Sequence, residues 1–197
     1  MNDPALLSSA EQQALLALAR GELRSFFGLS SSGEAASPAA DDLPAALRRP
    51  AGVFVTLHAD GRLRGCIGTF VAVQPLAEAV RELVIAAATR DPRFSPVTAD
   101  EADALELEIS VLSDPAPLSH ADQVDPGRHG LIVAGDDCRG LLLPQVAVEQ
   151  GWDASTFLSQ TCVKAGLPAD AWHAWDEGRD DDFSVLAFTA QVFSESP

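Results

Sequence analysis

One short run of the sequence holds residues suited to thiol chemistry: Arg62-Leu63-Arg64-Gly65-Cys66-Ile67-Gly68. On a β-strand, alternate residues share a face, so Arg64 and the sulfur of Cys66 are expected a few ångströms apart. A neighbouring guanidinium favours the charged thiolate, which is the nucleophilic form of cysteine. The sequence therefore predicts Cys66 as a nucleophile or thiol ligand, Arg64 as its electrostatic support and His129 as a candidate base.

Each of these predictions competes with a structural explanation. Free cysteine often fills a core as a small hydrophobe, and glycine within a strand often marks a bulge. His129 precedes Gly130 at a loop-to-strand junction, where a hydrogen bond to the backbone would explain it without catalysis. Cys162 is expected in the core and Cys138 in a hairpin, and neither is given a role.

Further residues are candidates for binding a substrate. Gly65 and Gly68 would let a ligand or another backbone approach the strand closely, and Thr69 ends the same motif. The chain could gather its few cations around a pocket for an anionic small molecule, with Arg93 and Lys164 as the binding residues. Separate structural ion pairs are the alternative. The cations considered are Arg64, Arg93, Arg128, Arg139 and Lys164.

No metal or cofactor is predicted. Cys66, Cys162 and His129 lack the close Cys or His spacing of a zinc site, and no Cys-x3-Cys-x2-Cys triplet could hold an iron–sulfur cluster. The acidic run at 176–182 lacks the pattern of a calcium loop and is expected to be a solvated surface loop.

The elements that must position these residues follow from periodicity and turn signals. Successive hairpins without regular βαβ alternation predict an α+β fold, mostly antiparallel β-sheet flanked by helices. We expect a single domain over 1–197, as one unit or two intimate lobes, with a loop at 30–40. The expected helices follow Ser8, Pro75 and Asp153, ending near Gly28, Arg90 and Gly166, and the expected strands are 53–58, 62–68, 105–111, 130–134, 139–143 and 183–193.

Charge and cysteine count exclude several classes of protein. The 197 residues carry 13 Lys and Arg against 29 Asp and Glu, a formal charge of −16. Such a surface repels nucleic acid and anionic membranes. Three cysteines without a close pair argue against a disulfide framework, and no leader or membrane span is expected, so the cytoplasm is the predicted location.

Several sequence blocks resemble the AmmeMemoRadiSam system protein A family, whose domain is of the AMMECR type. The resemblance starts with Leu63-Arg64-Gly65-Cys66-Ile67-Gly68-Thr69 and covers a family core of about residues 50–195. Later blocks include Asp91-Pro92-Arg93-Phe94, Ile109-Ser110-Val111-Leu112, His129-Gly130-Leu131, Gly140-Leu141-Leu142-Leu143-Pro144-Gln145-Val146, Gly151-Trp152-Asp153, Lys164-Ala165-Gly166-Leu167 and Val192-Phe193-Ser194-Glu195.

This resemblance implies an α+β fold dominated by antiparallel sheet and a gene context shared with a Memo-like protein and a radical SAM protein. Two hypotheses about function follow. The protein is either an enzyme or cofactor-handling component that uses Cys66 together with those partners, or a non-catalytic adaptor that binds one of them. A cleft joining Cys66, Arg64 and His129 would favour the enzyme.

Overall fold

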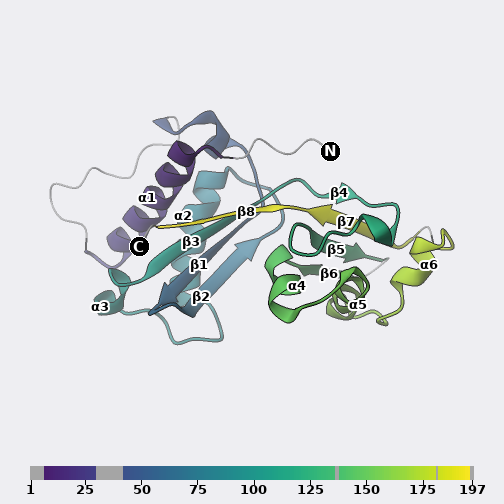
Figure 1. Ribbon diagram of the computed structural model, residues 1–197. Coiled ribbons are helices and arrows are strands. Elements are labelled where there is room, and N and C mark those ends of the chain that lie inside the picture. The colour runs from purple at the N-terminus through teal and green to yellow at the C-terminus, as the bar shows by residue number, and fades with distance from the viewer. Residues whose placement is uncertain (1–6, 30–41, 136–137, 181, 196–197) are drawn as a thin grey trace. The chain divides into compact units, whose positions relative to one another are not determined.

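A computed structural model describes residues 7–29, 42–135, 138–180 and 182–195 (Figure 1). The described residues form two compact units, one within 7–112 together with 191–195 and the other within 113–190. The predicted α+β fold is confirmed, because the strands form two antiparallel four-stranded sheets accompanied by helices. The loop predicted at 30–40 lies outside the described residues.

The sheet of the first unit has the strand order β2-β1-β3-β8. Its strands are β1 (Val53–Ala59), β2 (Arg62–Thr69), β3 (Glu106–Leu112) and β8 (Ala190–Ser194). β1 pairs antiparallel with both β2 and β3. The hairpin predicted at Asp60-Gly61 is confirmed, with φ of 51° and 69° at these two residues, as a turn that matches strand twist requires.

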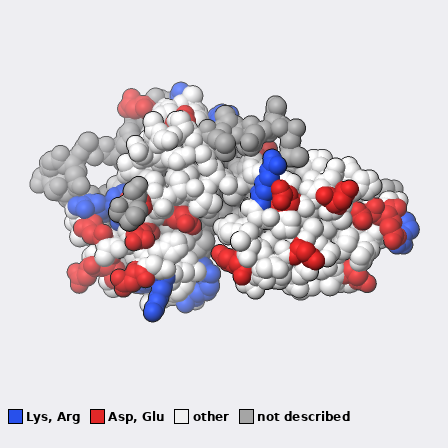
Figure 2. All heavy atoms as spheres, viewed as in Figure 1, with Lys and Arg blue, Asp and Glu red and all other residues white. Residues whose placement is uncertain are grey.

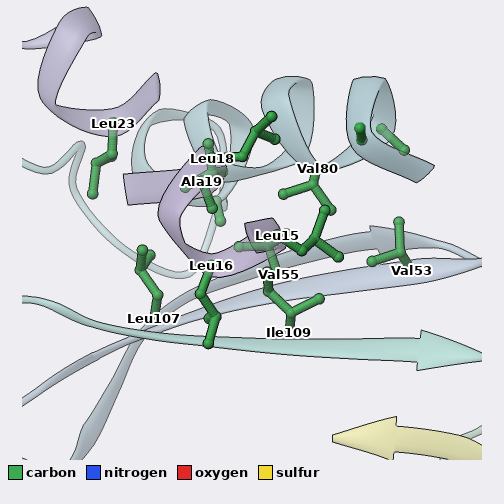
Figure 3. Packing of buried hydrophobic residues seen from close by; sticks show 14 of the residues in the cluster. Leu15, Leu16, Leu18, Ala19, Leu23, Val53, Val55, Val80, Leu107 and Ile109 are labelled. Carbon is green, nitrogen blue, oxygen red and sulfur yellow. The ribbon is translucent and has the colours of Figure 1, made fainter. Parts of the chain in front are cut away.

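Two helices cover one face of this sheet (Figure 1). The helix α1 (Ser9–Phe26) starts at the predicted capping box of Ser8 and Glu11, and α2 (Leu76–Thr89) starts directly after Pro75. Apolar residues of both helices pack onto alternate residues of β1 and β3. Together these side chains form the core of the unit (Figure 3). The remaining short elements are the 3-10 helix η2 (Ala45–Arg48) and α3 (Ala99–Ala102).

The second unit has its own sheet, β4-β7-β5-β6, and its own core. Asp153 caps α5 as predicted, because its carboxylate accepts the backbone N–H of Thr156. Phe157, Leu158 and Cys162 of α5 are fully buried in that core. The elements are β4 (Ala116–Pro117), η3 (Ala121–Gln123), β5 (Gly130–Ala134), β6 (Arg139–Leu142), α4 (Pro144–Gln150), α5 (Ala154–Lys164), α6 (Trp172–Asp176) and β7 (Ser184–Phe188).

The single last strand predicted over 183–193 is wrong. The segment forms β7 and β8, which belong to different sheets, with Thr189 between them. Burial alternates through Val185 and Ala187, but Phe188 is buried as well, so the inward face changes where the chain leaves the first of the two sheets. A run of β-forming residues does not reveal such a change of sheet.

The helix content bears on membrane insertion. Over the part of the chain that the structure describes, every helix is too short or too polar to cross a bilayer.

Candidate functional site

The strand that carries Cys66 contains a bulge just before it. Leu57 of β1 lies opposite Gly65, and His58 lies opposite Leu63, so Arg64 is an extra residue without a partner in β1. Such a bulge interrupts the alternation of side chains between the two faces of a strand. The expectation that alternation alone places Arg64 beside the Cys66 sulfur is therefore wrong, because Leu63, and not Arg64, is opposite a residue of the Cys66 face.

The face of the sheet that carries Cys66 is the one without α1 and α2. Thr56 is the cross-strand partner of Cys66, and its hydroxyl donates to the sulfur at 3.4 Å. The Thr56 side chain is buried, whereas Cys66 is half-buried. Cys66 is thus a free cysteine in a half-buried position, with a hydrogen-bond donor at its sulfur.

Asp91, which follows α2, holds the backbone of β2 at Cys66. Its Oδ2 accepts the N–H of Cys66 at 2.8 Å, and its Oδ1 accepts the N–H of Arg93 at 3.1 Å. The Asp91 side chain is only 2% exposed. Hydrogen bonds from Arg93 and from the Cys66 N–H outweigh the effect of burial and hold the pKa of Asp91 well below its usual range.

The guanidinium next to Cys66 belongs to Arg93. Its Nε and Nη2 donate to the two carboxylate oxygens of Asp91 at 3.0 and 2.7 Å, and Nη2 also reaches the Cys66 carbonyl at 3.4 Å. The hydrogen bond with Asp91 is the main cause that raises the pKa of Arg93, and the Cys66 side chain acts in the same direction. The cation whose hydrogen bonds reach residue 66 is therefore Arg93.

Arg64 serves a neighbouring loop. Its Nε and Nη2 donate to the carboxylate of Glu101 at 3.1 and 3.2 Å, and Nη1 donates to the carbonyl of Ser95 at 2.8 Å. Arg64 is the main reason that the pKa of Glu101 is lowered to about 2. Glu101 also completes the capping box of α3 with Thr98, so Arg64 connects the bulge to that helix.

The two glycines of the motif have packing roles. A Cβ built on Gly65 would lie 2.2 Å from the carbonyl oxygen of Ala87 in α2, so the helix backbone already occupies that space. A Cβ on Gly68 would lie 2.3 Å from the ring of Phe54. The predicted approach of a backbone to Gly65 is thus an approach of α2, whereas binding of a ligand at Gly65 or Gly68 stays a prediction.

Thr69 closes the end of β2. Its hydroxyl accepts the N–H of Val71 at 3.0 Å, a local turn that gives it a structural role beside the predicted one. Lys164 is the last residue of α5 in the second unit and is exposed. Its predicted part in a site with Arg93 stays a prediction, because the two residues belong to different units.

His129 also lies in the second unit and is buried, with 5% of its surface exposed. The imidazole Nδ1 accepts the backbone N–H of Asp125 at 3.1 Å, and the backbone N–H of His129 donates to the Asp125 carbonyl at 2.8 Å. Burial, followed by the charge of Arg128, lowers the pKa of the imidazole. These contacts supply the backbone role that competes with catalysis, and a pairing of His129 with Cys66 stays a prediction.

Sequence reasoning missed Thr56 and the role of Asp91. The sequence contains a signal for Asp91, because this acidic residue lies in the stiff loop two residues before Arg93, a candidate for binding. Thr56 could have been found from the hairpin register, which makes it the cross-strand neighbour of Cys66. Among the residues that the structure describes, no group of three or more His, Cys, Asp or Glu side chains is arranged to hold a metal ion.

Known proteins similar to this chain extend the resemblance over nearly its whole length. A family model described as AMMECR1 matches residues 16–193. A protein of Methanothermobacter thermautotrophicus is 49% identical over 161 residues, 79% of this chain and 81% of that one. Protein MJ0810 of Methanocaldococcus jannaschii is 42% identical over 163 residues, 79% of this chain and 78% of that one. The crystal structure of the uncharacterized protein PH0010 from Pyrococcus horikoshii, 39% identical, covers 96% of this chain and 94% of its own, with a TM-score of 0.79.

Proposed function

The chain belongs to the AMMECR1 family, and from that premise we propose that it is a thiol-dependent enzyme or cofactor-handling protein whose reactive group is Cys66. One observation carries the proposal. The half-buried Cys66 thiol receives a hydrogen bond from Thr56 and lies beside Arg93, which the buried carboxylate of Asp91 holds in place. A cysteine kept only for packing needs neither a donor at its sulfur nor a fixed cation beside it.

These neighbours suit a nucleophile. In the proposed step, the Cys66 thiol gives its proton to solvent water, and the sulfur donates an electron pair to an electrophilic carbon. A sulfur–carbon bond forms while the leaving group departs with the pair of the bond that breaks. The Thr56 hydroxyl donates a hydrogen bond to the Cys66 sulfur, and the Arg93 guanidinium donates to the Cys66 carbonyl, so both groups lie beside the reacting residue.

We propose the cellular setting from the resemblance of the sequence blocks alone. The protein would act in the cytoplasm as a component of the AmmeMemoRadiSam system, together with a Memo-like protein and a radical SAM protein. The three free cysteines support a reducing compartment. Co-purification of the two partners with a tagged copy of the full chain would test this part separately.

Alkylation of the intact protein tests the reactivity of Cys66. The folded chain is treated with iodoacetamide at pH 7, and mass spectrometry of the peptides reports the modification of each cysteine over time. We expect Cys66 to react faster than Cys138, which is also half-buried, and we expect Thr56→Val to slow it because valine keeps the shape but removes the donor. Cys162 serves as the internal unreactive control, because burial raises its pKa to about 11.

The alternative function, a non-catalytic adaptor, is favoured by a different observation. The segment after β2 exposes apolar side chains, with Val71 at 47% and Val73 at 77% exposure. If iodoacetamide leaves Cys66 unmodified in the folded protein, Cys66 is not a nucleophile, and the adaptor function is then the better supported of the two. In that case Val73→Asp should weaken retention of a partner in the co-purification.

A further inference from the structure

Resting on the proposed role of Cys66, we infer that the molecule which reacts there carries an anionic oxygen group, a carboxylate or a phosphate, and that Arg93 binds this group. Asp91 is the positioning residue, because it touches Arg93 and the Cys66 backbone.

Asp91 fixes Arg93 by one edge of the guanidinium. The Nε and Nη2 groups form a two-point pair with the carboxylate, at 3.0 and 2.7 Å, and such a fork restricts both the position and the plane of the group. The Phe94 ring adds a face contact, with its centre 5.5 Å from the central carbon of the guanidinium. A cation held in this way loses little freedom when it binds an anion.

One nitrogen of the Arg93 guanidinium, Nη1, is available. Within the described part of the chain, no protein atom accepts a hydrogen bond from Nη1, and the Arg93 side chain is 54% exposed. The neighbouring Nη2 is shared between Asp91 and the Cys66 carbonyl, which places Nη1 near the residue that bears the thiol. The N–H groups of Nη1 can therefore donate to a carboxylate or phosphate oxygen.

Arg64 shows what a purely structural arginine looks like in the same loop region. All three of its nitrogens donate to protein oxygens, and its side chain is 17% exposed. Arg93 has a comparable anchor but keeps one nitrogen unused and is three times as exposed. The contrast distinguishes an arginine that ties a loop together from one that is positioned for a ligand.

The charge of the whole protein makes the inference testable with a simple probe. At a formal charge of −16, the chain repels small anions, and Figure 2 shows acidic side chains on both units. Iodoacetate and iodoacetamide deliver the same alkyl carbon to a thiolate, but only iodoacetate carries a carboxylate next to that carbon. If the ratio of the iodoacetate rate to the iodoacetamide rate is higher at Cys66 than at a free thiol, an anion-binding group lies near Cys66.

The experiment measures the rate of Cys66 modification by each reagent in the full-length protein. The ratio of the iodoacetate rate to the iodoacetamide rate should exceed the ratio for N-acetylcysteine. Arg93→Gln should lower that ratio about tenfold, the loss expected for a hydrogen bond to a charged group. Arg93→Lys should keep part of the ratio, because lysine retains the charge without the two-point geometry. The matched control is Arg90→Gln, which removes the same charge three residues away and should change nothing.

A competition experiment on the unsubstituted protein does not depend on the folding of any variant. Inorganic phosphate or acetate should slow iodoacetate more than iodoacetamide, and the stronger of the two competitors identifies the class of oxygen group. A ratio equal to that of N-acetylcysteine, unaffected by phosphate, acetate and Arg93→Gln, would overturn the inference while leaving the thiol nucleophile intact. A Cys66 unreactive toward both reagents would instead overturn the proposed function itself.

Discussion

The carboxylate of Asp91 accepts the backbone N–H of Cys66 at 2.8 Å from the open side of an edge strand. Inside a sheet, a neighbouring strand would provide that acceptor and also a donor for the Cys66 carbonyl. Here Arg93 provides the donor, at 3.4 Å. The two side chains thus cap the edge of β2 at the residue that carries the thiol. An edge capped in this way is protected from pairing with another chain.

Asp91→Asn should destabilise the protein by about 1–3 kcal/mol at pH 7, the cost of weakening hydrogen bonds to a buried charged group. The pKa of Asp91 is lowered in the folded state, so its carboxylate stabilises the fold above the unfolded pKa of roughly 4, and this contribution is lost as the pH falls. The difference in stability between the variant and the unsubstituted protein should therefore begin to shrink below about pH 4 and be smaller at pH 3 than at pH 7. Urea unfolding followed by circular dichroism at both pH values measures the difference.

Asp103→Asn is the matched control for that measurement, because Asp103 pairs with Arg24 at 3.0 Å but is 52% exposed. Exposed pairs contribute little, so its effect should stay below about 1 kcal/mol. If the two variants lose equal amounts of unfolding free energy at pH 7, the buried Asp91 carboxylate contributes no more than an exposed, paired acid.

Gly65→Ala should destabilise the first unit by roughly 1–3 kcal/mol, as expected for overpacking against a rigid backbone. The added methyl carbon would lie 2.2 Å from the Ala87 carbonyl oxygen, so α2 would have to move away from β2. Gly21→Ala is the control, since nothing lies within 4 Å of its Cβ position in α1, and alanine favours helix by roughly 0.5–1 kcal/mol. Thermal unfolding of the two variants should shift in opposite directions.

Much of the fold follows from local signals in the sequence. Asp60-Gly61 specifies a two-residue turn, and the Ser8–Glu11 and Asp153 caps specify where helices begin, because each signal satisfies a backbone requirement nearby. The division of 183–193 into β7 and β8 depends instead on pairing with distant strands, which no local pattern contains.

The site shows the same limit at shorter range. Cys66 and a cationic neighbour follow from residue type, but alternation assigned that neighbour to Arg64, two residues away. A single extra residue at the bulge breaks the alternation, and the stiff loop after α2 brings Arg93 to Cys66 instead. To predict which of the two arginines lies beside Cys66, one must know the path of that loop. The packing of α2 on the sheet sets this path, and no local sequence pattern contains it.

Arg64→Gln should leave the rate of Cys66 alkylation by iodoacetamide unchanged within about twofold, because the Arg64 guanidinium is engaged with Glu101 and the Ser95 carbonyl. Its effect should appear in stability, as a loss of about 1 kcal/mol or less for a pair whose acid is 40% exposed. Glu101→Gln should give a similar loss, and the double variant should lose less than the sum. A large fall in Cys66 reactivity for Arg64→Gln would restore Arg64 as the neighbour of the thiol.

His129 should make the second unit sensitive to mild acid. The residue is 5% exposed, and burial, together with the charge of Arg128, lowers the pKa of its imidazole in the folded state. Because the folded pKa lies below the unfolded value of roughly 6.5, the neutral ring stabilises the fold above that pH, and the stabilisation is lost as the pH falls through the folded pKa. Asp125 opposes this shift, but the net direction is downward.

All three tryptophans lie in the second unit, at Trp152, Trp172 and Trp175, so tryptophan fluorescence during urea unfolding reports that unit. The free energy of unfolding should decrease from pH 7.5 to pH 5.5 in the unsubstituted protein. His129→Asn should flatten this decrease, because the amide oxygen can replace Nδ1 as the acceptor for the Asp125 N–H but does not titrate. His120→Asn, at a side chain that is 66% exposed, is the control and should keep the full slope. A slope that persists unchanged in His129→Asn would show that other groups cause the acid sensitivity and that the buried imidazole contributes nothing to it.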